Sequence, residues 1–202
     1  MRRWDAMPDL EHAELIDGIV YMASPVTNTH GVFHSRLTGW LLFYEMATPG
    51  CKANLGTTHL MTSDSVPQPD VALRILPEFG GQSSNEGDYP AGAPELIVEI
   101  SHTTSARDSG VKLRLYERSG VREYIIVRPS KKQIAWRELL DGKYQEIAPD
   151  ADGLYRSRIF PGLWMDPAAL WAGDLNGLAA AVKHGTATPE HAAFASALAA
   201  KK

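Results

Sequence analysis

The sequence predicts an α/β fold with one main domain and a terminal appendage. Three observations support this class: apolar residues at helical spacing between residues 28 and 48, short apolar runs rich in β-branched residues, and two Asp-Gly pairs between apolar runs. The chain has 202 residues, of which 44% are hydrophobic, enough for a substantial core. We expect the main domain over residues 1–170 and, over residues 171–202, an alanine-rich tail that is helical or frayed.

The two Asp-Gly pairs each predict a β-hairpin, because Asp-Gly suits a two-residue turn between strands. Asp17-Gly18 divides the apolar residues 15–22, and Asp141-Gly142 divides residues 133–147. One hairpin is therefore expected near the start of the main domain and one near its end.

Helices are expected where capping residues flank an apolar pattern. Thr27 or Asn28 can begin the first helix, which Pro49-Gly50 closes. A second helix should follow residues 101–105 and end at Gly120, a favourable C-terminal cap. Residues 189–200 are compatible with a third, weakly anchored helix.

The strands are expected between these helices and turns. Residues 77–94 are rich in Gly, Ser, Asn and Pro and predict a long surface loop, and residues 160–164 predict an aromatic turn packed against the sheet. Strands or extended runs are expected over residues 51–61, 70–76, 95–100, 121–128 and 153–159.

Two acidic residues occupy positions suited to phosphodiester hydrolysis. Asp70 lies at the entrance of one predicted strand, and Glu99 lies inside another, where an unpaired charge is costly. Lys112 is four residues from both Asp108 and Tyr116, so these three share one face of the following helix. Carboxylates can hold a hard divalent cation, and a lysine can offset charge on a phosphate. The pattern favours a metal-assisted nuclease.

Structural roles stay open for each of these residues. Asp70 can pair with a surface arginine, Glu99 can be satisfied by a nearby base, and Lys112 can be solvated. Glu14, next to the first hairpin, is a further candidate ligand for metal or water. His30 and His34 are four residues apart on a predicted helix and could bind zinc, although the glutamate of a zincin motif is missing.

The charge is unevenly distributed along the chain. A net charge of -4 and a pI near 6.0 argue against a protein that coats nucleic acid. Residues 107–137 nevertheless hold nine basic and three acidic side chains, so this segment carries +6 and the remainder -10. The excess is either a solvated helix face or a patch that faces phosphates.

The sequence also restricts the compartment. It shows no apolar signal region near its start and no run of the roughly 20 apolar residues that a membrane span needs. Cys51 is the one cysteine, so an intramolecular disulfide and a cysteine-rich zinc site are excluded. We expect a soluble, cytoplasmic protein without membrane association, in which Cys51 is a core residue.

Several blocks of the sequence, taken in order over about residues 10–165, resemble the Uma-two family. These are restriction-endonuclease-like proteins of bacteria within the PD-(D/E)XK nuclease superfamily. The resemblance implies a restriction-endonuclease-like mixed sheet flanked by helices, to which the two predicted hairpins add β-hairpins towards both ends. The matching blocks are Glu14-Leu15-Ile16-Asp17-Gly18, His30, Pro69-Asp70-Val71, residues 94–101, residues 108–112 with Tyr116, and residues 120–124.

The resemblance also implies roles for individual residues. Asp70 and Glu99 match metal ligands, and Glu14 matches an acidic position before the Asp-Gly turn. The chain departs from the superfamily signature at Ser101, which stands two residues after Glu99 where a lysine is usual. Lys112 matches the position to which this family has moved the lysine.

We therefore expect a DNA endonuclease that uses Mg²⁺ or Mn²⁺. Asp70, Glu99 and Glu14 are its expected metal ligands and catalytic residues, with Lys112 as the charge-stabilising group. A catalytically degenerate nucleic-acid-binding or regulatory module with the nuclease fold is one alternative, and a metal-dependent hydrolase of a small phosphate compound is another. DNA is the expected partner, and a homodimer is expected because two cuts across a duplex need two active sites. Motifs of serine hydrolases, nucleoside triphosphatases and dehydrogenases are missing.

Overall fold

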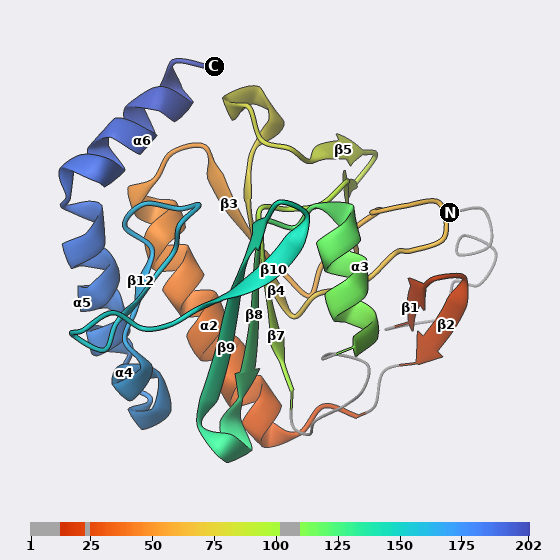
Figure 1. Cartoon of the computed structure of the whole chain (residues 1–202), viewed down its shortest axis with the longest axis horizontal. Coiled ribbons are helices and arrows are strands. Elements are labelled where there is room, and N and C mark those ends of the chain that lie inside the picture. The colour runs from red at the N-terminus through yellow and green to blue at the C-terminus, as the bar shows by residue number, and fades with distance from the viewer. Residues whose placement is uncertain (1–12, 23–24, 102–109) are drawn as a thin grey trace.

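A six-stranded mixed sheet forms the centre of the computed structural model, which describes residues 13–22, 25–101 and 110–202 (Figure 1). The strand order is β10-β9-β8-β7-β4-β3; β7 and β8 are parallel, and the other neighbours are antiparallel. The strands are β3 (Cys51–Leu55), β4 (Val71–Ile75), β7 (Leu96–Ile100), β8 (Glu123–Arg128), β9 (Gln133–Leu140) and β10 (Lys143–Ile147). The predicted α/β class is confirmed.

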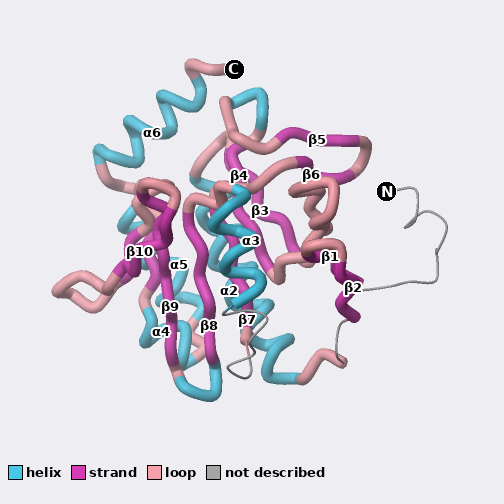
Figure 2. The backbone as a smooth tube through the Cα atoms, turned by 45° about the vertical axis from the view of Figure 1, so that its right-hand side comes forward, coloured by secondary structure: helices cyan, strands magenta, loops and turns pink. Residues whose placement is uncertain are grey.

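Helices cover both faces of this sheet, as Figure 2 shows. The long helix α2 and the C-terminal helices lie on one face, and α3 lies on the other. The helices are α2 (Asn28–Ala47), α3 (Lys112–Ser119), α4 (Pro167–Ala172), α5 (Leu175–Thr186) and α6 (Pro189–Ala199). Of the helices in the described ranges, none is both long and apolar enough to cross a membrane.

Two core residues of α2 hold the aromatic turn that the sequence predicts over residues 160–164. Trp40 and Tyr44 of α2 are fully buried, and their polar atoms reach this turn. Trp40 Nε1 donates to the carbonyl of Trp164 at 2.8 Å, and the Tyr44 hydroxyl donates to the carbonyl of Pro161 at 2.9 Å. Large aromatic side chains thus contribute apolar burial and satisfy the turn's backbone at the same time.

Both Asp-Gly hairpins form. Asp17 and Gly18 join β1 (Ala13–Ile16) to β2 (Ile19–Met22), and both turn residues have positive φ, 52° and 73°. Asp141 and Gly142 join β9 to β10 with φ of 50° and 76°. Positive φ at both central residues is the requirement of a type I′ turn. The second hairpin extends the main sheet, because β9 also pairs with β8.

Two expected segments differ from the structure. The surface loop contains a short hairpin, β5 (Ser84–Glu86) and β6 (Tyr89–Ala91), whose strands lack the apolar alternation that would predict it. The run over residues 153–159 holds β11 (Tyr155–Arg156), which pairs with β12 (Trp164–Met165) and not with the main sheet. Each hairpin is a separate two-stranded ladder.

The second predicted helix is described from Lys112 to Ser119, and Gly120 ends it in the left-handed conformation with φ of 84°. Residues 102–109, which include Asp108, lie outside the described residues, so the placement of Asp108 beside Lys112 stays a prediction. In the tail, Leu178 and Leu198 are buried in the core of the α2 face. The division at residue 170 stays a prediction.

Two buried glutamates accept hydrogen bonds from backbone amides where the parallel strands β7 and β8 begin. Glu95, next to β7, accepts from the amides of Ile75 at 2.8 Å and Gln82 at 2.9 Å. Glu123, at the start of β8, accepts from the amide of Arg158 at 2.6 Å and from the Ser157 hydroxyl at 2.8 Å. Burial raises the pKa of Glu123 to about 7.

This raised pKa predicts a pH-dependent stability. The unfolded chain releases the Glu123 proton near pH 4.5 and the folded protein near pH 7, so stability from protonated Glu123 is lost as pH rises through this window. We expect Glu123→Gln to become more stable relative to the wild type between pH 5 and pH 8, by up to about 3 kcal/mol. Urea unfolding at both pH values measures this. Glu146→Gln, at an exposed position, is the control, and parallel pH profiles of wild type and Glu123→Gln would contradict the assignment.

Candidate active site

Strand register brings Asp70 and Glu99 together. Asp70 immediately precedes β4, and β4 pairs with β7 antiparallel, with Val71 opposite Val98. One further step in this register sets Asp70 opposite Glu99, with both side chains on one face of the sheet. The Ile100 amide donates to Oδ2 of Asp70 at 2.6 Å, which fixes the carboxylate at the end of β7.

Helix α3 supplies the basic residue of the site. Nζ of Lys112 lies 2.8 Å from Oε1 of Glu99, and the Tyr116 hydroxyl donates to the same oxygen at 2.7 Å. Lys112 and Tyr116 are one helical turn apart, so both side chains point from α3 to the sheet. Lys112 and Glu99 are almost fully buried, and the solvated alternative for this lysine is therefore wrong.

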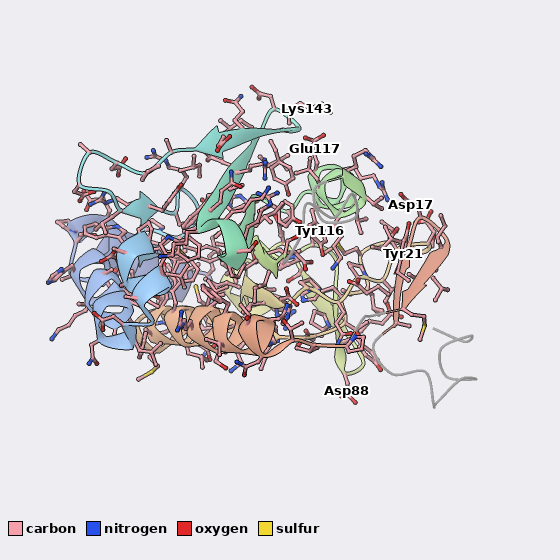
Figure 3. The ribbon with its side chains drawn as sticks, turned by 90° about the horizontal axis from the view of Figure 1, so that it is seen from below. Asp17, Tyr21, Asp88, Tyr116, Glu117 and Lys143 are labelled. Atoms are coloured by element: carbon pink, nitrogen blue, oxygen red, sulfur yellow. The ribbon has the colours of Figure 1, made fainter. Side chains whose placement is uncertain are left out.

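Two neighbouring elements hold helix α3 in place near its C-terminal end. Figure 3 labels Glu117 of this helix together with Lys143 and Asp17 of the neighbouring segments. Glu117 accepts from Nζ of Lys143 at 2.8 Å and from the amide of Tyr144 at 2.9 Å, which ties α3 to β10. Arg118 forms an ion pair with Asp17 in the turn between β1 and β2. These contacts position the helix that carries Lys112.

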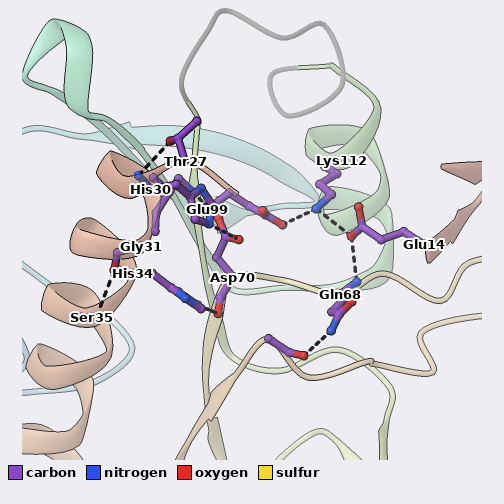
Figure 4. A network of polar contacts seen from close by, with 12 residues as sticks. Glu14, Thr27, His30, Gly31, His34, Ser35, Gln68, Asp70, Glu99 and Lys112 are labelled. Atoms are coloured by element: carbon purple, nitrogen blue, oxygen red, sulfur yellow. Dashed lines mark hydrogen bonds and ion pairs between the residues drawn. The ribbon is translucent and has the colours of Figure 1, made fainter. Parts of the chain in front are cut away.

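Glu14 of β1 joins the site through the lysine. Its Oε1 lies 2.8 Å from Nζ of Lys112 and accepts from the amide of Gln68, also at 2.8 Å (Figure 4). The ammonium therefore lies between the carboxylates of Glu14 and Glu99. The structure thus brings Glu14, Asp70, Glu99 and Lys112, the four residues expected from the sequence, into one network.

The two histidines of α2 complete the surroundings of Asp70. Nε2 of His30 lies 3.2 Å from Oδ1 of Asp70, and Nε2 of His34 lies 2.7 Å from the Asp70 backbone oxygen. The sequence identified these histidines as a possible zinc pair and His30 also as one of the blocks that resemble the family, but it gave neither a link to Asp70. Within the described ranges, no group of three His, Cys, Asp or Glu side chains is arranged to hold a metal ion. Their helical spacing, combined with a helix that crosses the end of β4, was the signal that could have linked them to Asp70.

The pKa values of the site residues are shifted by burial and by the charges of neighbouring side chains. Burial raises the pKa of Glu99, and the negative charges of Asp70 and Glu14 raise it further, although Lys112 opposes them. Burial alone would lower the pKa of Lys112, but the carboxylates of Glu99 and Glu14 outweigh it and raise this pKa. Burial would likewise raise the pKa of Asp70, yet hydrogen bonds from His30 and the Ile100 amide lower it.

The donor atoms fit a hard divalent cation. Mg²⁺ takes carboxylate oxygens, often from only one or two side chains, and completes its shell with water and phosphate oxygens. Asp70 and Glu99 are neighbouring carboxylates, and of the Glu99 oxygens only Oε1 takes part in a hydrogen bond among the described residues. A cation beside them would offset the repulsion that raises the pKa of Glu99. The carboxylates of Asp70 and Glu99 therefore fit the divalent cation that the family resemblance implies.

The basic segment of residues 107–137 is spread over several parts of the fold. Lys112 is buried in the site, Arg118 pairs with Asp17, and Arg128 contacts Gln133. Lys131 and Lys132 are exposed in the turn between β8 and β9. The segment is thus neither one helix face nor one patch, and only part of it is available to phosphates.

The Lys112 network predicts a measurable coupling in stability. Lys112→Met leaves two buried carboxylates without their cation, so we expect the free energy of unfolding to fall by about 3–5 kcal/mol. Adding Glu14→Gln removes one of these charges and should restore part of the loss. Urea unfolding of the two single variants and the double variant measures the coupling. Additive effects would show that the ammonium and the Glu14 carboxylate do not interact.

Comparison with known proteins gives the family. A Uma2 family profile, described as "putative restriction endonuclease", matches residues 1–169. The fold is similar to a crystal structure of a putative nuclease of DUF820 from Anabaena variabilis, with a TM-score of 0.61 and 15% identity over 79% of this chain and 89% of that one. A search of curated proteins finds no match. Since the profile covers most of the chain, this protein, with its mixed sheet and its acidic pair beside a lysine, belongs to the Uma2 family of restriction-endonuclease-like proteins.

Proposed function

We propose that this protein is a divalent-cation-dependent DNA endonuclease whose centre consists of Asp70, Glu99 and Lys112. Family membership supports a nuclease-like function in general. The observation that carries the more specific proposal is the convergence of two strand-borne carboxylates and one helix-borne lysine at the same end of the sheet. This combination can hold a hard cation and a phosphate side by side.

In this proposal Asp70 and Glu99 hold the cation. Glu14 was expected as a third ligand, but its Oε1 already contacts Lys112 and the Gln68 amide, so its proposed role is to hold the lysine. Mg²⁺ or Mn²⁺, when bound, supplies Lewis-acid activation of water and neutralises charge on the phosphate. The chain's own residues keep the carboxylates oriented. His30 and the Ile100 amide fix the two oxygens of Asp70, and Tyr116 fixes Oε1 of Glu99.

Lys112 supplies a permanent positive charge in the same place. Its ammonium is held between Glu14 and Glu99, and its raised pKa keeps it protonated at neutral pH. A fixed cation in a site of low polarity stabilises negative charge that develops on a phosphate during attack. Glu14 thereby acts as a positioning residue for the lysine.

Asp70→Asn tests the acidic pair. The amide keeps the shape of the side chain and can still accept from the Ile100 amide, so folding should be retained. It loses the charge that holds a cation, and we expect cleavage of supercoiled plasmid with Mg²⁺ or Mn²⁺ to fall at least about 100-fold. Gel analysis of nicked and linear products measures the rate.

Asp88→Asn is the matched control for this experiment. Asp88 is exposed in the turn between β5 and β6, and Figure 3 shows it at the edge of the molecule. This variant should cleave like the wild type. Undiminished cleavage by Asp70→Asn would overturn the role of Asp70.

The same assay bears on the oligomeric state. Linear product formed without a nicked intermediate would support the expected homodimer, since both strands would then be cut in one encounter.

A catalytically degenerate module is the second candidate, and one observation favours it. Lys112 already forms direct ion pairs with both Glu14 and Glu99, so each of these two acids has a cationic partner without a metal. The two candidates differ in their response to cations. A ligand that binds only the folded state raises the melting temperature.

We therefore expect Mg²⁺ or Mn²⁺ at millimolar concentration to raise the melting temperature of the wild type and of Asp88→Asn, but not of Asp70→Asn. Differential scanning fluorimetry measures this shift, and Ca²⁺ provides a comparison with another hard cation. No shift in any protein, together with no cleavage, would favour the degenerate module. Phosphate release from nucleotides without DNA cleavage would favour a hydrolase of small phosphate compounds.

A further inference from the structure

A surface pocket of about 380 Å³ lies beside the candidate active site. It is lined by the first turns of α2, by the turn between β8 and β9, and by Trp171 of α4. Its volume falls within the range of pockets that hold small ligands. Nothing in the proposed hydrolytic centre uses these side chains.

The pocket and the acidic pair share one end of the sheet. Thr29 lines the pocket, and the next residue of α2, His30, contacts Asp70. Pro129 lines the pocket two residues after Val127, whose carbonyl accepts from the Ser101 amide at 2.9 Å where β7 ends. In Figure 1 the start of α2 and the β8–β9 turn lie together at the lower edge of the sheet. A DNA strand whose phosphate lies at the acidic pair can therefore extend towards the pocket along the same end of the sheet.

The lining combines aromatic rings with positive charges. The rings of Phe33 and Trp171 lie 5.7 Å apart and are tilted by 50°; Phe33 is buried, and Trp171 is only partly covered. The Arg36 guanidinium lies 4.9 Å from the centre of the Phe33 ring, and its Nη1 donates to the carbonyl of Leu170 at 3.0 Å. Arg36 is thus held in place at the wall of the pocket.

Lys132 supplies the second charge. It is exposed, and its backbone has a positive φ of 46°, which sets it at the tip of the turn after β8. Among the described residues, no carboxylate forms an ion pair with Lys132 or with Arg36. Two cations without acidic partners beside an accessible indole ring match the chemistry of a nucleotide, which has a flat base and a negative phosphate.

We propose that this pocket binds an unpaired nucleotide of the DNA substrate, with the base on Trp171 and the phosphate between Arg36 and Lys132. The identity of the polymer rests on the proposed endonuclease function. The nucleotide is unpaired because, in a duplex, stacking on its neighbours covers both faces of a base and leaves none for Trp171. The preferred substrate is therefore single-stranded DNA or a duplex with an unpaired stretch beside the cleaved phosphate.

Binding without cleavage tests the pocket directly. Fluorescence anisotropy in EDTA compares a fluorescein-labelled single strand of about 15 nucleotides with the corresponding duplex. We expect tighter binding of the single strand by the wild type. Trp171→Ala should weaken this binding about 10-fold, and Trp171→Phe, which keeps an aromatic face, should restore most of it.

Lys132→Gln provides a second variant at an exposed position that does not support the core. Loss of one phosphate contact should lower the slope of log Kd against log salt by about 0.7 for single-stranded DNA. Lys183→Gln is the matched control, because this exposed lysine lies on α5 near Phe43 and Met46, at the other end of α2. It should leave Kd and slope unchanged. Wild-type affinity and salt slope in Lys132→Gln, with wild-type affinity in Trp171→Ala, would overturn the proposal.

Cleavage assays on the same variants separate this proposal from the proposed function. If the wild type cleaves DNA and the pocket variants bind and cleave equally well, the pocket proposal fails and the endonuclease function stands. If the wild type does not cleave but binds single strands through Trp171 and Lys132, the pocket proposal stands and the endonuclease function fails. Equal binding of single strands and duplexes by the wild type would contradict the unpaired nucleotide.

Discussion

The architecture around the site depends on one buried ammonium group. Nζ of Lys112 bridges the carboxylates of Glu14 and Glu99 and so joins three segments that are distant in the sequence, β1, β7 and α3. Taking each ion out of water costs several kcal/mol, and only close partners and further hydrogen bonds compensate for this. The Gln68 amide and the Tyr116 hydroxyl provide these further bonds. The cluster therefore fixes the register of α3 against the sheet, since a shift of α3 would leave charges buried without partners.

The sheet and its two flanking layers contribute different parts of the site. The strands bring Asp70 and Glu99 together through their register, and each carboxylate then receives a partner from a different helix layer: His30 from α2 and Lys112 from α3. The position at the sheet end is decisive, because only there can side chains from both layers reach the same pair of strands. The aromatic and basic pocket continues from this end along α2.

Local signals in the sequence were sufficient for much of the fold and singled out Asp70 and Glu99 as acids at strand positions, while their roles as ligands stay a prediction. The Asp17-Gly18 turn and the Gly120 cap depend on neighbouring residues alone, so they could be predicted. The contact between Asp70 and Glu99 depends on which strands pair and in which register, and no local pattern encodes that. The roles of His30 and Trp171 depend on how helices cross the end of the sheet. Trp171, in particular, belongs to a segment whose sequence predicted only an alanine-rich tail.

The parallel strands β7 and β8 carry buried acids at both ends, and the two ends use them differently. Beside Glu99 the acids face a cation, whereas at the opposite end Glu95 and Glu123 accept from backbone amides of crossing segments. Ion pairing with a buried lysine and binding of backbone amides are thus the roles of separate groups of carboxylates. During evolution a relative could exchange Asp70 while the amide-bound glutamates continue to hold the chain together. Such a fold can change the residues at one end of the sheet and keep its framework.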